Sequence, residues 1–475
     1  MSGGGRVAWL REPGMGASVL VAGLSSAFGV VLLTATAYIA ALLLADPYIG
    51  DSGTLAVVVG ILGVLLLGVA VYVGAMVTAN TFATVVAGRT RRIALLRLIG
   101  ASAGAQRREV ATQGLVVGVI GSVAGLVGGT ALAGALAAGA AVWVDAPADG
   151  FVLVRGELLV PAAVVALTTW AAAWAGSRRV LAVTPLQALD GAQEVAYATL
   201  VRRRGRHVAA GVLTGIGGGM LALGIVVGLV TPLGVVIAFV GGLLSFTGLS
   251  LGAAWVMPPL LRLVGRGLGG GVVGRLAAQN ALRHPERSAR MAIGVVMSVA
   301  LVTMFAVATE SAKSVLVRSS GGELPADLVV MIDAFAAIMM GLVGVAAVIA
   351  AVGLVNLLAI GVRQRRAELG LLRALGLSAA QTRRLVLLEA VHLTVTGLLF
   401  GLVLGAFYGW AGAQSLLGAV PMPPQWQTGT LVAPAVPLAP VVVVVAATAL
   451  LTLVAAVLPT RTATRVSPLA ALSAP

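Results

Sequence analysis

The sequence predicts an all-α integral membrane protein with about ten transmembrane helices. Apolar residues make up 59% of its 475 residues and charged residues only 10%, whereas a soluble globular chain carries about 25% charged residues. Long apolar stretches recur along the chain, and the basic residues gather between alternate stretches. Such a chain cannot cover its surface with polar groups, which excludes an ordinary cytosolic enzyme, a disordered protein and a fibrous protein.

The predicted spans follow from stretch length, because a helix needs roughly 20 apolar residues to cross a hydrocarbon core of about 30 Å. The qualifying stretches are 17–45, 55–87, 110–143, 156–176, 208–230, 232–261, 291–309, 331–360, 385–418 and 431–459. The first follows Arg6 and Arg11 as a signal peptide would. It is much longer than the roughly 7–15 apolar residues of a signal peptide, so we expect a retained span.

The basic residues predict the orientation. The chain has 31 Lys+Arg and 16 Asp+Glu, a net charge of +15. With the N-terminus inside, every basic residue except Arg155, Lys313 and Arg318 falls in a cytoplasmic segment. Cytoplasmic loops carry the excess of Lys and Arg, so both termini are predicted to be cytoplasmic in a multi-pass plasma-membrane protein. The absence of cysteine and the three scattered histidines give little support to a metal site.

An internal repeat predicts the domain organisation. RTRRIALLRLIGASAGAQRR (89–108) matches RRAELGLLRALGLSAAQTRR (365–384) without a gap, at an offset of 276. A second pair, RRVLAVTPLQAL (178–189) and RTATRVSPLAAL (461–472), closes each half. We therefore predict two parallel four-span repeats, 1–190 and 271–475, on either side of a two-span insertion, 191–270, in a 4+2+4 layout.

Glycines four residues apart recur on the helix that follows each copy of the repeated segment. At the same offset they are Gly121, Gly125 and Gly129 in the first half and Gly397, Gly401 and Gly405 in the second. Small residues on one face let two membrane helices approach closely. Helix packing is the favoured interpretation, and sliding of these faces during a conformational cycle is the alternative.

The repeated segment itself predicts a short amphipathic helix. In 365–376 the leucines alternate with charged residues at helical spacing. Gly376 is expected to end this helix, and Ser378 to cap the next one. Such a helix can anchor at the membrane surface or bind a cytoplasmic partner. Its appearance in both halves favours a partner that is also present in two copies.

These motifs resemble a known family. RRAELGLLRALGLS (365–378), LLEA (387–390) and the two PLxAL endings are similar to the FtsX-like permease domain of MacB-type, or type VII, ATP-binding-cassette transporters. The layout is similar to bacitracin-type exporter permeases without their large extracytoplasmic domain. The resemblance implies that the short helices couple the permease to a separate ATPase subunit, present in two copies, that binds ATP–Mg. The implied coupling residues are Arg97, Leu98, Gly100, Ser102, Glu368, Arg373, Leu375, Gly376 and Ser378.

The resemblance implies a transporter permease that is not itself an enzyme and holds no cofactor. The chain lacks the GxxxxGK[ST] pattern that cradles nucleotide phosphates. The predicted function is export, or extraction from the membrane, of an amphipathic or hydrophobic compound such as a peptide, lipid or drug. One alternative is an ion-coupled secondary transporter that uses Glu389 and His392, one turn apart. Another is a signalling membrane protein that transmits ATPase motion without transport.

Overall fold

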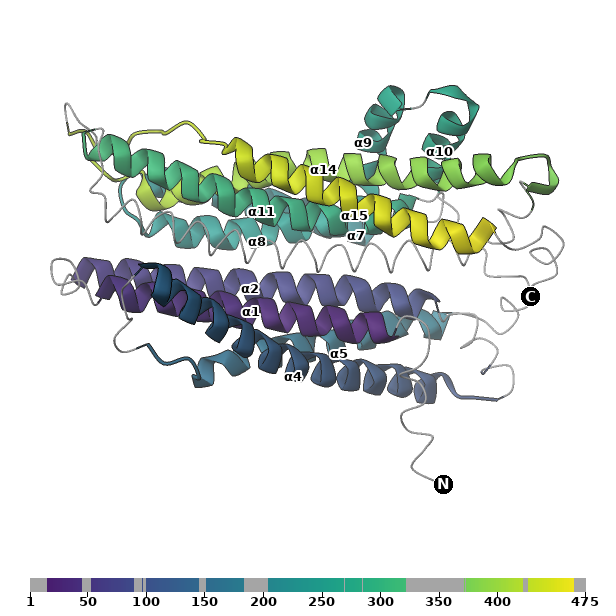
Figure 1. Ribbon diagram of the computed structural model, residues 1–475, viewed down its shortest axis with the longest axis horizontal. Coiled ribbons are helices and arrows are strands. Elements are labelled where there is room, and N and C mark those ends of the chain that lie inside the picture. The colour runs from purple at the N-terminus through teal and green to yellow at the C-terminus, as the bar shows by residue number, and fades with distance from the viewer. Residues whose placement is uncertain are drawn as a thin grey trace, which may run out of the picture. The chain divides into compact units, whose positions relative to one another are not determined.

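The computed structural model describes most of the chain, and the regular elements of this part are all helices, with no β-strand among them (Figure 1). The described residues are 15–44, 53–88, 96, 100–144, 151–182, 204–268, 270–283, 285–321, 371, 373–421 and 426–464. The chain divides into two compact units, Met1–Gln193 and Glu194–Pro475. The finer three-part division at 190 and 270 stays a prediction.

Seven of the described helices contain a stretch long and apolar enough to cross a membrane. These stretches are Ser18–Leu42, Gly104–Gly139, Gly156–Ala175, Gly205–Gly228, Gly234–Leu251, Met291–Ser319 and Ala379–Leu417. The predicted span 55–87 lies in a helix, and the predicted span 431–459 does so from Leu438 onward; these helices contain the shorter apolar stretches Gly60–Met76 and Leu438–Leu450. The predicted span 331–360 lies outside the described residues. The membrane class is therefore shown, while the number of ten spans and the 4+2+4 layout stay predictions.

The first unit is a four-helix bundle. Its elements are α1 (Met15–Leu44), α2 (Gly53–Gly88), α4 (Ala103–Val144), the 3-10 turn η3 (Gly156–Leu158) and α5 (Leu159–Ala182). Helix α1 packs against α4 and α2, and α5 closes the ring by packing against the same two helices. Met15, Val110 and Val117 form the core at one end, and Val30, Leu33 and Leu158 form it at the other.

The second unit is built around one long helix. Its elements are α7 (Arg204–Gly228), α8 (Gly234–Leu251), α9 (Ala253–Leu268), α10 (Gly271–Arg283), α11 (Pro285–Ser319), α14 (Ala379–Leu417) and α15 (Leu438–Thr464). Helix α14 contacts all six of the others. Its contact with α8 includes a hydrogen bond of 2.9 Å between the hydroxyls of Ser245 and Tyr408. The predicted insertion helices α7 and α8 thus pack within the second unit.

The sixth predicted span, 232–261, is wrong as a single helix. Helix α8 ends at Leu251, and α9 begins at Ala253. Between them, Gly252 has φ −86° and ψ 3°, which lie outside the α-helical range, and its N–H still bonds the Gly248 carbonyl. A side chain at Gly252 would lie 3.3 Å from the Cβ of Ala210 on α7, so the bend places backbone close to that helix. Hydropathy alone misses this break because apolar residues continue on both sides of it.

The paired glycines lie where two helices approach each other most closely. In the first unit, a Cβ at Gly121 would lie 2.6 Å from the Cβ of Ala22, and one at Gly129 would lie 2.8 Å from the Cα of Ala27. Gly125, between them, faces the carbonyl of Gly23. Helix α4 therefore packs on α1 with almost no side chain between the backbones, as small residues allow. The Ser26 hydroxyl donates to the Ser122 carbonyl across this contact, at 3.0 Å.

The second unit repeats this arrangement between α14 and α11. A Cβ at Gly397 would lie 2.9 Å from the Cβ of Val295, and one at Gly401 would lie 2.8 Å from the Cβ of Val299. At Gly405 the nearest atom would be the Ala300 carbonyl oxygen, at 2.5 Å. The two long glycine-bearing helices thus have the same kind of partner, the first membrane helix of the corresponding half.

The segment after α14 folds back onto the end of that helix. Gln414 is buried, and its side-chain amide donates to the Thr430 carbonyl at 2.8 Å while its carbonyl accepts from the Val432 N–H at 2.8 Å. Trp410 donates to the Val432 carbonyl at 2.6 Å, and the Ala435 N–H donates to the Ser311 hydroxyl at 3.2 Å. Side chains of α14 and α11 therefore satisfy the backbone groups that this irregular segment would otherwise leave unpaired.

Replacing Gln414 with leucine is expected to release this segment. Leucine has a similar size but leaves the Thr430 carbonyl and the Val432 N–H without partners, and each such buried group costs about 1–3 kcal/mol. Residues 426–437 should then be cut by proteinase K at least about tenfold faster, since tenfold corresponds to about 1.4 kcal/mol. Leucine at Gln279, an exposed glutamine on α10, is the control. Equal cleavage of the two variants would contradict the prediction.

Candidate functional site

Two tight bends of the chain, here called the corners, contain the predicted coupling residues that the structure describes. The first, Gly100–Ser102, precedes α4, and the second, Arg373–Ser378, precedes α14. The described members of the predicted set are Gly100, Ser102, Arg373, Leu375, Gly376 and Ser378. Arg97, Leu98 and Glu368 lie outside the described residues. The corners can be compared because they occupy matched positions in the two repeats.

The first corner has the geometry of a glycine-terminated helix. Gly100 has φ +101°, a conformation that costs other residues roughly 1–2 kcal/mol. The N–H of Ala101 donates to the Leu96 carbonyl at 2.9 Å, which is the longer hydrogen bond of a Schellman ending. The Ser102 hydroxyl then accepts from the Ala105 N–H at 3.2 Å and caps α4. The preceding turn and α4 are thus joined by a defined bend.

The second corner repeats this geometry and strengthens the cap. Gly376 has φ +106°, and its N–H donates to the Arg373 carbonyl at 3.1 Å. The Ser378 hydroxyl accepts from the Gln381 N–H at 3.1 Å, and the Gln381 side chain accepts from the Ser378 N–H at 2.8 Å. This reciprocal pair is a capping box. The first copy has Ala105 at the position matching Gln381, so its cap has only one of these bonds.

The second corner exposes apolar side chains. Leu371 and Leu375 are four residues apart, hence on one face of a helical turn, and they are 52% and 73% exposed. Helix α14 has 39 residues, which at 1.5 Å per residue gives about 58 Å, nearly twice the hydrocarbon core. Its first turns, which carry Arg383 and Arg384, therefore extend beyond the membrane. Exposed leucines at such a tip suit contact with a partner protein or with the membrane surface.

The polar residues further along α14 make structural contacts. Glu389, on α14, accepts a hydrogen bond of 2.9 Å from the Asn280 side chain of α10. His392 is 1% exposed, and its Nδ1 lies 2.6 Å from the Leu388 carbonyl of its own helix. The Thr452 hydroxyl of α15 donates to the Thr394 hydroxyl at 3.0 Å. These contacts tie α14 to α10 and α15, which favours a packing role for Glu389 over the proton-carrying role considered above.

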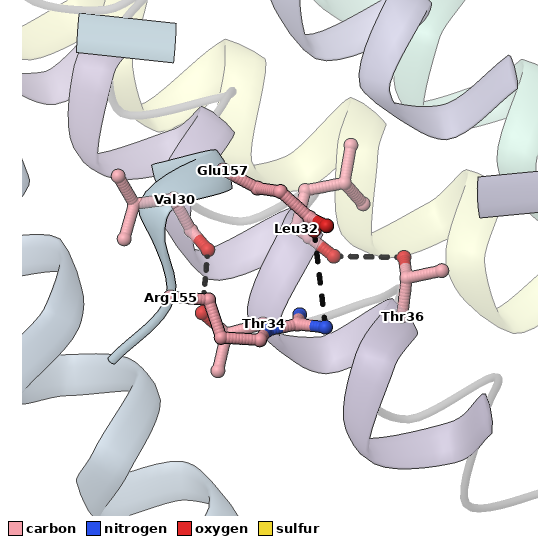
Figure 2. A network of polar contacts seen from close by, with 6 residues as sticks. All are labelled: Val30, Leu32, Thr34, Thr36, Arg155 and Glu157. Atoms are coloured by element: carbon pink, nitrogen blue, oxygen red, sulfur yellow. Dashed lines mark hydrogen bonds and ion pairs between the residues drawn. The ribbon is translucent and has the colours of Figure 1, made fainter. Parts of the chain in front are cut away.

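Two threonine hydroxyls of α1 bond within their own helix (Figure 2). The hydroxyls of Thr34 and Thr36 each donate to the carbonyl four residues earlier in α1, at 2.8 Å. Figure 2 also shows Arg155, whose guanidinium lies 3.8 Å from the Glu157 carboxylate just before α5. Glu157 is exposed, so this ion pair contributes little to stability. The ion pair thus lies beside the entry to α5, while the two threonine bonds stay within α1.

Comparison with known proteins identifies the family to which both corners belong. The model of the FtsX-like permease C-terminal domain matches residues 64–185 and again residues 340–468, together more than half of the chain. Each match contains one corner and the glycine-bearing helix that follows it. The comparison with curated proteins finds no match. The two matches confirm the resemblance noted at residues 365–378, and the chain, a multi-pass membrane permease of the ATP-binding-cassette type, belongs to the FtsX-like permease family and carries its domain twice.

Proposed function

We propose that this chain is the permease subunit of an efflux transporter of the MacB type, driven by a separate ATPase subunit. Each of its two corners would bind one ATPase copy, which would also bind ATP–Mg. The observation that carries the proposal is the exposed Leu375 on the rigid Gly376–Ser378 corner at the start of α14. An exposed apolar side chain on a fixed support suits a groove of a partner protein.

The geometry supports transmission of motion from the corners into the membrane. The capping box joins the second corner to α14, which continues without a break to Leu417. Because α14 packs on α11 through backbone contacts at Gly397, Gly401 and Gly405, a displacement of its tip moves a rigid pair of helices rather than a flexible side-chain layer. The contact of α4 with α1 offers the same path in the first unit.

The chemistry of the spans supports an amphipathic or hydrophobic substrate, such as a peptide, lipid or drug. Several hydroxyls within the described spans bond to carbonyls of their own helices, as those of Thr130, Thr168 and Thr247 do. Many large apolar side chains of α4, α7 and α14 are exposed. Such surfaces suit contact with lipid tails or an apolar substrate rather than a hydrated solute. The short segments between spans support export or extraction without a large external domain.

The distribution of charge supports the proposed orientation. Arg107 and Arg108 lie in the first turns of α4, and Arg383 and Arg384 in the first turns of α14, next to the corners. Arg155 lies at the opposite end of the first unit, before α5. By the positive-inside rule the corners face the cytoplasm, where ATP is available, and both termini lie on the same side of the plasma membrane.

The test is isolation of the intact complex. The tagged full-length chain, extracted from its native membranes in mild detergent, should retain a P-loop ATPase at two copies per permease, measured by native mass spectrometry. A permease without any ATPase, together with uptake that follows a pH gradient and is abolished by Glu389→Gln, would establish the ion-coupled alternative instead. An ATPase-bound complex that moves no lipid, peptide or drug in proteoliposomes would favour the signalling alternative.

A further inference from the structure

Helices α9 and α10 form a hairpin whose place in the chain sets its depth in the membrane. The hairpin starts at Ala253, two residues after the candidate span Gly234–Leu251, and ends at Arg283, just before α11. Helix α8 has 18 residues, or about 27 Å, close to the thickness of the hydrocarbon core. In Figure 1, α9 and α10 lie across the direction of the long helices of the second unit. The hairpin is thus held at the edge of the hydrocarbon core.

One face of the hairpin packs on its own unit. Met257 and Leu261 are buried in α9, which contacts α11 and α14. Gly265 lies beside the ring of His392, where an added Cβ would be 3.9 Å from Cδ2. In α10, Ala277 is buried, and Asn280 donates to Glu389 at 2.9 Å. These contacts with α14 fix the hairpin and determine which of its faces remains outside.

The outer face combines apolar and basic side chains. Trp255, Leu263 and Val272 are 75%, 66% and 69% exposed. The exposed arginines beside them are Arg262, Arg266, Arg275 and Arg283. Residues 253–283 contain no Asp or Glu. A face with this composition is unfavourable in water, but at headgroup depth its apolar side chains enter the acyl boundary while its arginines reach phosphates.

We propose that this outer face of α9 and α10 is a binding surface for anionic phospholipid headgroups of the membrane in which the chain is embedded. The four arginines, in a segment that contains no Asp or Glu, supply the charge complementarity. Trp255 lies four residues beyond the end of α8, at the depth that tryptophan prefers in membrane proteins. The surface is continuous with the membrane-spanning helices on both sides, so lipid reaches it without any rearrangement.

The hairpin and the proposed ATPase surface lie at different positions along the axis of α14. It contacts α14 at Glu389, ten residues after the helix begins at Ala379, which corresponds to about 15 Å along the axis. A partner seated on the corner therefore does not need to cover α9 or α10. The Asn280–Glu389 bond places the lipid-binding hairpin on the same helix that carries the corner, so bound lipid would hold α14 at a defined depth.

A single-cysteine experiment tests the location of the surface, because the chain contains no cysteine. A bimane label is attached to Leu263→Cys on the outer face or to Ala380→Cys at the exposed start of α14, and each chain is placed in phosphatidylcholine nanodiscs. Nitroxide lipid labelled at the headgroup should quench the label at residue 263 at least about twofold more than the label at 380, because only the former lies at the interface. Quenching of residue 263 by aqueous iodide alone, or by neither reagent, would overturn the proposal.

Charge variants test the recognition of anionic lipid. The nitroxide is placed on phosphatidylglycerol, and the lipid fraction that gives half-maximal quenching of the label at residue 263 is measured. R266Q/R275Q should raise this fraction by about tenfold, because each surface arginine adds to the attraction. R108Q/R384Q removes the same charge away from the hairpin and should leave it unchanged. Equal values in the two double variants, or equal quenching by nitroxide phosphatidylcholine, would overturn anionic recognition. The assay contains no ATPase, so its outcome is separate from that of the proposed function.

Discussion

Gly125→Ala is expected to destabilise the first unit strongly, whereas Gly128→Ala, three residues further along α4, should have no destabilising effect. A Cβ at residue 125 would contact the carbonyl oxygen of Gly23 and lie 2.7 Å from the Cβ of Ser26 and 2.9 Å from the backbone nitrogen of Ala27. Two of these three atoms belong to the backbone of α1 and have no rotamer by which to move away. At Gly128 no atom lies within 4 Å of the added carbon.

The expected loss of stability in Gly125→Ala is the balance of two opposing free-energy contributions. Alanine gains roughly 0.5–1 kcal/mol over glycine inside a helix, and this gain is the same at both positions. Overpacking a tight contact costs typically about 1–3 kcal/mol. Since α4 would have to move away from α1, we expect the upper part of that range and weakening of the Ser26–Ser122 hydrogen bond at 3.0 Å. The difference in melting temperature between Gly125→Ala and Gly128→Ala in detergent measures the steric term alone.

The same comparison can be made in the second unit. A Cβ at Gly405 would lie 2.5 Å from the Ala300 carbonyl oxygen and 2.6 Å from the Cβ of Thr303. Gly412, two turns further along α14, has no atom within 4 Å of such a carbon. We expect Gly405→Ala to lower the melting temperature and Gly412→Ala to leave it unchanged or raise it. If each pair of variants melted together, the two helices would not approach each other as closely as described.

Spacing in the sequence identifies which face of each helix packs, but not against which helix. The four-residue interval from Gly121 to Gly129 marks one stripe on α4. That this stripe meets α1 depends on contacts between residues about 100 positions apart along the chain, as in the Ser26–Ser122 bond. No local periodicity records such a pairing. The sequence therefore predicts which face of α4 packs, but it does not predict which helix packs against that face.

The hairpin of α9 and α10 was missed for a related reason. The predicted span 232–261 averages hydropathy across Gly252, and apolar residues predominate both before and after that position. The signal that separates them is amphipathicity, since Met257 and Leu261 lie on one face of α9 while Arg262 and Arg266 lie on the other. Prediction from the amphipathic pattern of the helix, rather than from average hydropathy, would have ended the span at Leu251.

The corners were more accessible to prediction because local chemistry determines them. Glycine favours a positive φ, and serine favours an N-cap, so the roles of Gly376 and Ser378 in the bend follow from residue type alone. The reciprocal bond from Gln381 was also readable in the spacing S-x-x-Q. What the corner binds does not follow from its own residues, because the amphipathic pattern of 365–376 fits a membrane surface as well as a protein groove.

Leu375→Glu is expected to remove most of the association with the ATPase subunit. Leu375 is 73% exposed on a corner whose backbone is fixed by Gly376 and the Ser378 cap. Burying a leucine side chain contributes about 1.5–3 kcal/mol, and burying an unpaired carboxylate is strongly unfavourable. The affinity should therefore fall by at least about tenfold to a hundredfold, since each tenfold step is about 1.4 kcal/mol. The measurement is ATPase bound to the tagged chain at a series of ATPase concentrations.

The matched control for this substitution lies in the first copy of the repeat. Ile99 corresponds to Leu375 at the offset of 276, so Ile99→Glu introduces the same charge at the other corner. The two copies differ, because Arg92 and Gln113 stand in the first where Glu368 and Glu389 stand in the second, and the capping box is described at the second corner. We therefore expect Leu375→Glu to reduce ATP hydrolysis by the reconstituted complex more than Ile99→Glu does, and the double variant to abolish it. Equal and complete retention of hydrolysis in all three variants would show that the corners do not bind the motor.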